Sequence, residues 1–159
     1  MRLGVCFQLD DLSCLVLGLQ MSSLDPYVGF ADGASRSTRN IASAAWVLFD
    51  PSHRLVESGG IFLGPATNNV AEYSSVIALL SAASASGISR LVVYMDSQLV
   101  VSQLNHVYQV RDPVLLRKVL RVRLLERHFE FITYIHIPRE FNSLADSLAN
   151  YVIEWHLLH

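Results

Sequence analysis

The sequence predicts an α/β fold built on a mixed five-stranded sheet, and three observations lead to this class. Between residues 27 and 63, three short apolar runs are joined by turn-forming residues, which is typical of an antiparallel meander. From Thr67 to Ser86, apolar residues instead recur with the spacing of an amphipathic helix. The run Leu91–Asp96 is apolar up to its last residue, as in a parallel strand buried on both faces. We therefore expect antiparallel and parallel strands in one sheet, with helices on both of its faces.

The antiparallel part should contain the first three strands. The first is expected at Tyr27–Asp32, followed by a polar turn over Gly33–Asn40. The second, Ile41–Phe49, and the third, Arg54–Leu63, are separated by a short turn, and the pair Gly59-Gly60 suggests a β-bulge in the third strand.

The second half of the chain alternates helices with strands. Thr67 is a good N-cap for the long helix, and Gly87 is a typical residue for its C-terminal end. The remaining elements are expected to be a short helix from Ser97 to Leu104, a helix that starts at Asp112-Pro113, a strand over Phe129–Ile137, and a final helix that Asn142 caps and that ends near Glu154.

Composition indicates a single compact domain. The chain has 159 residues, of which 52% are hydrophobic and 16% charged, so it is long and apolar enough to bury a core. The net charge of −2 does not suggest a nucleic-acid partner, but residues 90–139 carry eight basic and four acidic side chains. This region is either a solvated helix surface or a surface that binds a polyanion.

Residues 1–26 are expected to form an extension outside the domain, which should span residues 27–155 and be followed by a short tail at 156–159. The apolar run Leu12–Leu19 is too short to span a bilayer, so no membrane association is expected. A processed leader remains an alternative, although the adjacent pair Asp10-Asp11 is unusual for one.

The two cysteines, Cys6 and Cys14, show neither a disulfide framework nor a zinc-binding spacing. This pattern favours a reducing compartment inside the cell, either the cytoplasm or the nucleus.

Glu72 lies in phase with Val76, Leu79 and Leu80 on the stripe of the long helix that should face the core. Burying a carboxylate there costs free energy unless it is paired with a cation or a hydrogen-bond donor. Glu72 is therefore either a first-turn acid favoured by the helix dipole or a metal ligand that points into a cleft.

Three further acids occur at strand ends or at the start of a helix, where functional side chains are often found. Asp32 and Asp96 each end an apolar strand, and the carboxyl ends of parallel strands share one edge of a sheet. Asp146 lies early in the final helix, whose packing side is expected to comprise Leu144, Ala145, Leu148, Ala149 and Val152. Each acid alone could be a turn, cap or dipole residue.

Taken together with Glu72, the three aspartates imply a cation site. Two unit charges 4 Å apart repel by about 4 kcal/mol at an effective dielectric constant near 20, so four crowded carboxylates require protons or metal ions. An all-oxygen donor set suits Mg²⁺ or Mn²⁺ rather than zinc, and a pair of such ions can act on the attacking water and the leaving oxygen of a phosphodiester.

Four blocks of the sequence resemble those of type 1 ribonuclease H, in the compact style of archaeal and plant-retroelement domains. They appear in the family's order and extend over roughly residues 27–152. The blocks are Asp32–Ser35 (DGAS), Thr67–Tyr73 (TNNVAEY), Asp96–Val100 (DSQLV) and His136–Asp146 (HIPREFNSLAD).

The resemblance implies a ribonuclease H-like fold and hydrolysis of the RNA strand of RNA–DNA hybrids with two Mg²⁺ ions, Mn²⁺ being an alternative. The metal ligands would be Asp32, Glu72, Asp96 and Asp146. A neighbouring reverse transcriptase domain is a further expected partner, and the domain is expected to be monomeric.

The resemblance also implies roles for residues around the acids. His136 matches the family histidine that moves protons or assists product release, and Arg139 is placed to contact a phosphate. Asn68, Asn69 and Gln98 match residues that read the minor groove of the hybrid, where amides can pair with 2′-hydroxyls and base edges.

Two departures from the family pattern leave other functions open. The usual turn after the first acid is replaced by residues 36–40, where Arg36 and Arg39 could substitute for its backbone contact, and the basic protrusion of some members is missing. One alternative is a degenerate, non-catalytic nucleic-acid-binding domain of the same fold, although all four acids are intact. Another is a different nuclease or a transposase-like enzyme.

Overall fold

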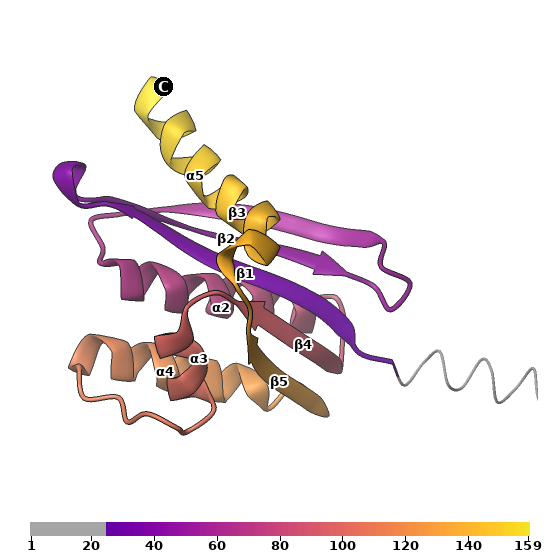
Figure 1. The fold of residues 1–159 in the computed structure, drawn as a ribbon. Coiled ribbons are helices and arrows are strands. Elements are labelled where there is room, and N and C mark those ends of the chain that lie inside the picture. Colours follow the sequence, from indigo (N-terminus) through magenta and orange to yellow (C-terminus); the bar gives the residue numbers. More distant parts are fainter. Residues whose placement is uncertain (1–24) are drawn as a thin grey trace, which may run out of the picture.

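The computed structural model describes residues 25–159, so the expected extension, the possible leader and both cysteines lie outside the described residues. The five strands form one mixed sheet in the order β3-β2-β1-β4-β5 (Figure 1), as the sequence predicts. The antiparallel part pairs β1 with β2 and β2 with β3, and the parallel part pairs β1 with β4 and β4 with β5. The strands are β1 Tyr27–Arg36, β2 Ile41–Phe49, β3 Leu55–Gly64, β4 Arg90–Met95 and β5 Phe131–His136.

Helices cover both faces of this sheet. Three of them share one hydrophobic core on one face, namely α2 Asn68–Ala85, α3 Gln98–Leu104 and α4 Pro113–Glu126. The last helix, α5 Ser143–Leu158, crosses the opposite face over β1, β2 and β3 (Figure 1). In the described part of the chain, no helix is long and apolar enough to cross a membrane.

The helix starts follow the capping residues expected from the sequence. The Thr67 side chain accepts a hydrogen bond from the Val70 amide, and the Ser97 side chain accepts one from the Val100 amide. Asp112 accepts from two amides of the first turn of α4, at 2.8 and 2.9 Å. Gly87, just past the end of α2, has a φ of +73°, a left-handed conformation that glycine adopts without a steric penalty.

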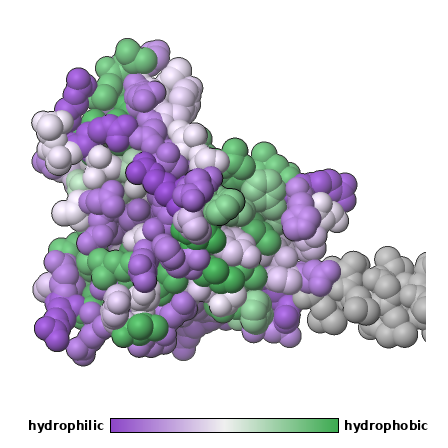
Figure 2. Space-filling model, in the orientation of Figure 1, coloured by the Kyte–Doolittle hydropathy of each residue, from purple (hydrophilic) through white to green (hydrophobic). Residues whose placement is uncertain are grey.

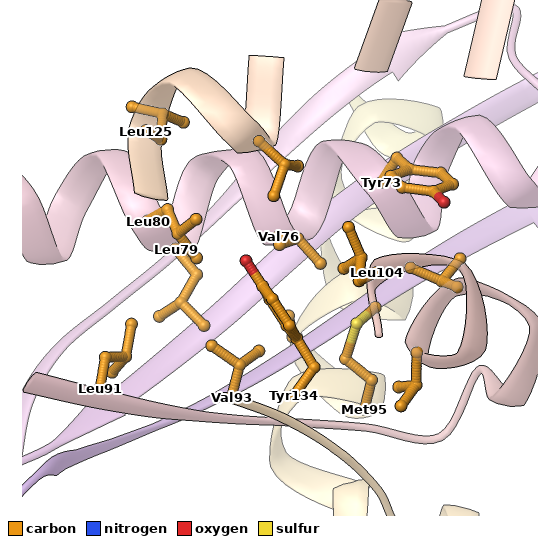
Figure 3. Packing of buried hydrophobic residues seen from close by; sticks show 14 of the residues in the cluster. Tyr73, Val76, Leu79, Leu80, Leu91, Val93, Met95, Leu104, Leu125 and Tyr134 are labelled. Carbon is orange, nitrogen blue, oxygen red and sulfur yellow. The ribbon is translucent and has the colours of Figure 1, made fainter. Parts of the chain in front are cut away.

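The face covered by α2 holds the larger of the two cores (Figure 3). Val76, Leu79, Leu80 and Ala83 are fully buried there, which confirms the predicted stripe of α2. They pack against β4 and β5 residues and against α3 and α4, among them Leu91, Val93, Met95, Leu104, Leu125 and Tyr134.

The face covered by α5 is built from small residues instead. Ala34 and Ala45 of the sheet pack against Ala149 and Ile153 of α5. The Ser43 hydroxyl donates a hydrogen bond to the carbonyl of Ala149 at 2.6 Å. The small side chains let the helix backbone come close enough for this bond, so α5 is fixed to the strands at short range.

Several local expectations were wrong. β1 continues to Arg36 because its pairing with β2 extends to Arg36–Ile41, so residues 33–36 are strand, and the turn is a 3₁₀ helix over Ser37–Arg39. The α5 helix runs to Leu158, past the expected end near Glu154 and through most of residues 156–159. Leu144 is 60% exposed because it faces away from the alanine contact that holds α5.

The pair Gly59-Gly60 does not form a bulge. The irregularities in the pairing of β2 with β3 lie at Ala42/Ser43 and Leu48/Phe49 instead. A Cβ on Gly59 would lie 2.3 Å from the ring of Trp46, and one on Gly60 would lie 2.4 Å from Val152. These glycines make room for neighbouring side chains.

Candidate active site

Three carboxylates meet where β1 and β4 part. Pairing of these parallel strands ends at Phe30–Tyr94, two residues before Asp32, and Asp96 directly follows β4. Each of Asp32, Glu72 and Asp96 offers an oxygen, and these three atoms lie within 4.8 Å of one another. Asp32 and Glu72 are 4% and 5% exposed. The structure thus brings together three of the four acids predicted as metal ligands, although Asp32 lies within its strand and not at its end.

Gly33 lets α2 approach β1 closely enough to bring Glu72 beside Asp32. A Cβ at this position would lie 2.3 Å from backbone atoms of both Ala71 and Glu72, so any other residue would push the helix away. The Gly33 amide also donates a hydrogen bond to the Glu72 carboxylate at 3.2 Å. This role was not predicted, although a glycine immediately after the acid is a signal that could have indicated it.

Asp146 lines the same cleft from the first turn of α5 but is not part of the group of three. Its carboxylate forms an ion pair with Arg139 at 2.9 Å, and the Arg139 side chain also borders the cleft. Asp146 accepts a second, longer hydrogen bond of 3.3 Å from the Asn150 amide one turn later.

Asn142 fixes the start of α5 against β1. It occupies the expected N-cap position, but its side chain makes no capping hydrogen bond. The side-chain amide instead donates to the carbonyl of Ala31 at 3.0 Å, just past the point where β1 loses its pairing with β4. Ala31 precedes Asp32, and Asp146 lies one helical turn after Asn142. This bond therefore helps to fix the positions of Asp32 and Asp146 relative to each other.

The cleft has a volume of about 510 Å³, and its rim is polar. Asn68 lines it as expected and accepts a hydrogen bond from the Ser35 hydroxyl at 3.4 Å. Arg36 lines it too and donates to the Asn150 side chain, so one of the two arginines considered for the altered turn reaches the site. Asn150 was not predicted, although its i+4 spacing from Asp146 could have indicated it.

Three predicted substrate or proton-transfer residues do not line this cleft. Asn69 follows Asn68 at the start of α2, and Gln98 is exposed in the first turn of α3. His136 ends β5 opposite Met95 and is also exposed. Their roles stay predictions.

Several basic side chains of α4 contact other parts of the protein. Arg123 pairs with Glu126 at 2.7 Å and donates to the Leu104 carbonyl at 2.8 Å. Lys118 donates to the Ser74 hydroxyl at 3.2 Å. The exposed positive charge of this helix therefore comes mainly from Arg117 and Arg121.

The carboxylates are electrostatically crowded. Burial raises the pKa of Asp32 far above its ordinary value, and the nearby charges of Glu72 and Asp96 raise it further. Burial also raises the pKa of Glu72, with Asp96 adding to the effect. Among residues 25–159, neither Asp32 nor Glu72 has a cationic side chain within ion-pair distance.

This donor set fits a divalent cation. Buried carboxylates without a cationic partner need a positive charge to ionise at neutral pH, and oxygen donors suit Mg²⁺ and Mn²⁺. Asp32, Glu72 and Asp96 are the residues that would hold such an ion.

Comparisons with known proteins show the family of this chain. The family model described as "Reverse transcriptase-like" matches residues 30–152. Ribonuclease HI of Halobacterium salinarum is 41% identical over 125 residues, which cover 79% of this chain and 63% of that protein. The crystal structure of RNase H1 from the same organism superposes with a TM-score of 0.78 at 40% identity, over 81% of this chain and 98% of that one. The chain belongs to the ribonuclease H family.

Other members of the ribonuclease H family show the same likeness. The bifunctional protein Rv2228c of Mycobacterium tuberculosis is 40% identical over 122 residues, which cover 76% of this chain and 33% of that protein. LC11-RNase H1, solved in complex with an RNA/DNA hybrid, has a TM-score of 0.78 and 30% identity over 82% of this chain and 99% of that one. The chain spans less than two thirds of the length of the curated relatives it matches.

Proposed function

We propose that this chain is an endoribonuclease that hydrolyses the RNA strand of RNA–DNA hybrids with the help of two divalent metal ions, Mg²⁺ by preference. The observation that carries the proposal is the convergence of Asp32, Glu72 and Asp96 within 4.8 Å at the floor of a polar cleft. The family supports it, because LC11-RNase H1 has been solved with an RNA/DNA hybrid.

The acids of the cleft divide into an inner and an outer group. Asp32, Glu72 and Asp96 would hold the first ion, and Asp146, on the far wall, would join them in holding the second. Bound ions would supply activation of the attacking water and neutralisation of the charge that develops on the leaving oxygen. Glu72 is held for this task by the Gly33 amide, and Asp146 by the anchor of Asn142 on β1.

The rim of the cleft carries groups suited to a nucleic-acid backbone. Arg36 and Arg139 can form charge-assisted hydrogen bonds with phosphate oxygens. Asn68 offers an amide that can both donate to and accept from a ribose hydroxyl, which DNA lacks. These side chains would position the strand, and the inner acids would hold the ions that promote hydrolysis.

A single assay tests the proposal. Purified protein is incubated with end-labelled RNA–DNA, RNA–RNA and DNA–DNA duplexes in the presence of Mg²⁺, Mn²⁺ or EDTA. We expect the RNA strand of the hybrid to be cut only when a divalent ion is present, and the other duplexes to remain intact. Hybrid binding without cleavage under every condition would instead identify a non-catalytic binding domain.

A further inference from the structure

An apolar groove of about 480 Å³ lies on the α5 side of the sheet, next to the acidic cleft. Its floor is formed by two neighbouring cross-strand pairs, Val28–Phe49 and Phe30–Tyr94. The Phe30 ring stacks on Tyr94 with centroids 5.3 Å apart and meets the edge of Phe49 at 5.9 Å. Since side chains alternate along a strand, Phe30 and Asp32 point to the same face of β1, and the groove therefore adjoins the cleft.

The walls of the groove come from outside the sheet. Ile137 and Phe141 follow β5, and His53 lies in the turn between β2 and β3. Phe141 is 68% exposed. The α5 helix packs on β1, β2 and β3 and does not close the groove, so residues 25–159 leave it open to solvent. Figure 2 shows apolar surface between the start of α5 and the point where the chain enters β1.

The chain itself contains an occupant of matching chemistry. Residues 1–24 lie outside the described part and lead into β1 at Tyr27, one residue before Val28 of the groove floor. Within them, the run Leu12–Leu19 contains four leucines and one valine and no charged residue. This composition suits a groove whose only lining side chains with polar atoms are His53 and Tyr94.

The connecting chain is long enough. Leu19 and Tyr27 are eight residues apart, and an extended chain covers about 3.3 Å per residue, which gives a reach of roughly 26 Å. Burial of these leucines would also remove the exposed rings of the groove from water, which is the main source of favourable free energy in such a contact. We propose that the groove binds the apolar run Leu12–Leu19 of the same chain.

Cross-linking tests where this run lies. Cys6 and Cys14 are the only cysteines, so a Cys6→Ser background leaves one thiol inside the run. Glu140→Cys adds a second thiol beside the groove without removing a lining side chain, and Ser37→Cys adds one at the opposite end of β1 as a control. Cys14 can reach both by chain length, since 13 residues extend to about 43 Å, more than the roughly 33 Å length of β1.

With oxidised glutathione as the oxidant, we expect an intramolecular disulfide to form at least about tenfold faster with Glu140→Cys than with Ser37→Cys. Equal rates would overturn the proposal, because they would show that Cys14 has no preferred position. Disulfides that join two chains, seen as covalent dimers with Glu140→Cys, would also overturn it and identify a second copy as the occupant.

Thermal unfolding of the full chain gives an independent measurement. Phe141 and Val107 are both 68% exposed in the described structure, so Phe141→Ser and Val107→Ser should be equally harmless if nothing covers the groove. If Leu12–Leu19 covers it, Phe141→Ser should lower Tm by about 3 °C or more, and Leu15→Ser with Leu17→Ser should do the same. Combining Phe141→Ser with the two leucine substitutions should then lower Tm little further, because both sets of changes remove the same contact. Equal melting of the Phe141 and Val107 variants would contradict the proposal.

Discussion

The two faces of the sheet differ in what they bury. On the α2 face, large side chains such as Leu79, Leu80 and Met95 interdigitate in one extended core. On the α5 face, the buried cluster consists of three alanines and Ile153, with Ile41 and Leu148 half-buried against it, and a hydrogen bond from Ser43 reaches the helix backbone. The acidic cleft opens beside this second contact, next to the first turn of α5.

This difference suggests that the α2 face mainly stabilises the fold and that the α5 face mainly positions the side chains of the cleft. A large apolar core contributes free energy in proportion to the area it removes from water, but it tolerates small shifts of its members. Contacts between backbones and small side chains bury less area and fix the distance between elements more closely. We therefore expect substitutions on the α2 face to change stability, and substitutions at the cleft and the α5 contact to change catalysis.

The largest effect is expected at the cleft. Asp96→Asn keeps the size of the side chain and removes one negative charge, so hybrid cleavage should fall by more than about 10³-fold. In EDTA its Tm should not decrease, because the substitution relieves repulsion with Asp32 and Glu72. Asp112→Asn, at the cap of α4, is the matched control and should cleave normally. Normal cleavage by Asp96→Asn would rule out this residue as a ligand.

The α2 face should show the opposite pattern. Leu79→Ala removes a fully buried side chain that also fills the space above Gly29, so the free energy of unfolding should fall by about 3–5 kcal/mol. Cleavage per folded molecule should stay within about twofold, because the cleft is not touched. Urea unfolding and single-turnover cleavage measure the two quantities, and Leu158→Ala, at an 80% exposed position, is the control.

Asn142→Ala tests both roles at once, because we expect this residue to contribute to stability and to position Asp146. The substitution leaves the Ala31 carbonyl without its donor and should cost about 1–3 kcal/mol of stability. It should also reduce cleavage by releasing Asp146. Asn105→Ala removes a similar bond, from an amide to the Tyr134 carbonyl at 2.9 Å, and neither of these two residues lines the cleft. We expect the control to lose stability alone; equal losses of activity would refute a positioning role for Asn142.

The effect of pH on stability should also come from the cleft. The folded chain holds protons on Asp32 and Glu72 that the unfolded chain releases above its ordinary carboxyl pKa values near 4. The unfolded state then binds fewer protons, so stability in EDTA should fall as pH rises, by at most about 1.4 kcal/mol per pH unit for each proton. Melting between about pH 5 and pH 8 measures the slope, which Asp32→Asn or saturating Mg²⁺ should reduce.

The smallest effect is expected on the outer surface of α4. Reversing Arg117 and Arg121 to Glu should lower hybrid affinity by about tenfold and reduce its salt dependence, if this helix contacts phosphates as its charge suggests. Arg36→Glu, at the rim of the cleft, provides the comparison. Unchanged affinity and salt slope in the Arg117/Arg121 variant would show that α4 only faces solvent.

Much of the fold was predictable because its signals are local. The hydroxyl of Thr67, the pair Asp112-Pro113 and the left-handed Gly87 each act within one helical turn. The apolar run of β4 correctly predicted a strand. It wrongly predicted burial on both faces, because only Leu91, Val93 and Met95 are buried and the residues between them are half-buried. The sequence could not show that β1 would continue past Asp32, since that depends on pairing with a strand whose register is set elsewhere.

The residues of the cleft were likewise only partly predictable from the sequence. The acids could be identified because carboxylates at core-facing positions need a physical reason, and three of them converge as predicted. The roles of Gly33 and Asn142 were not predicted, because each depends on how closely two elements distant in the sequence approach. Asn150 was not predicted either, although its spacing from Asp146 within one helix was a usable signal. Arg139 was assigned to phosphate from its motif alone, and its ion pair with Asp146 appears only in three dimensions.

The contact at Gly33 has a consequence for how the protein responds to heat. The contact between β1 and α2 at Gly33 is too close to admit a methyl group. We therefore expect the distance between Asp32 and Glu72 to change little as the molecule expands on heating. The catalytic rate should consequently rise along a single Arrhenius line almost to the melting temperature and then collapse together with the fold.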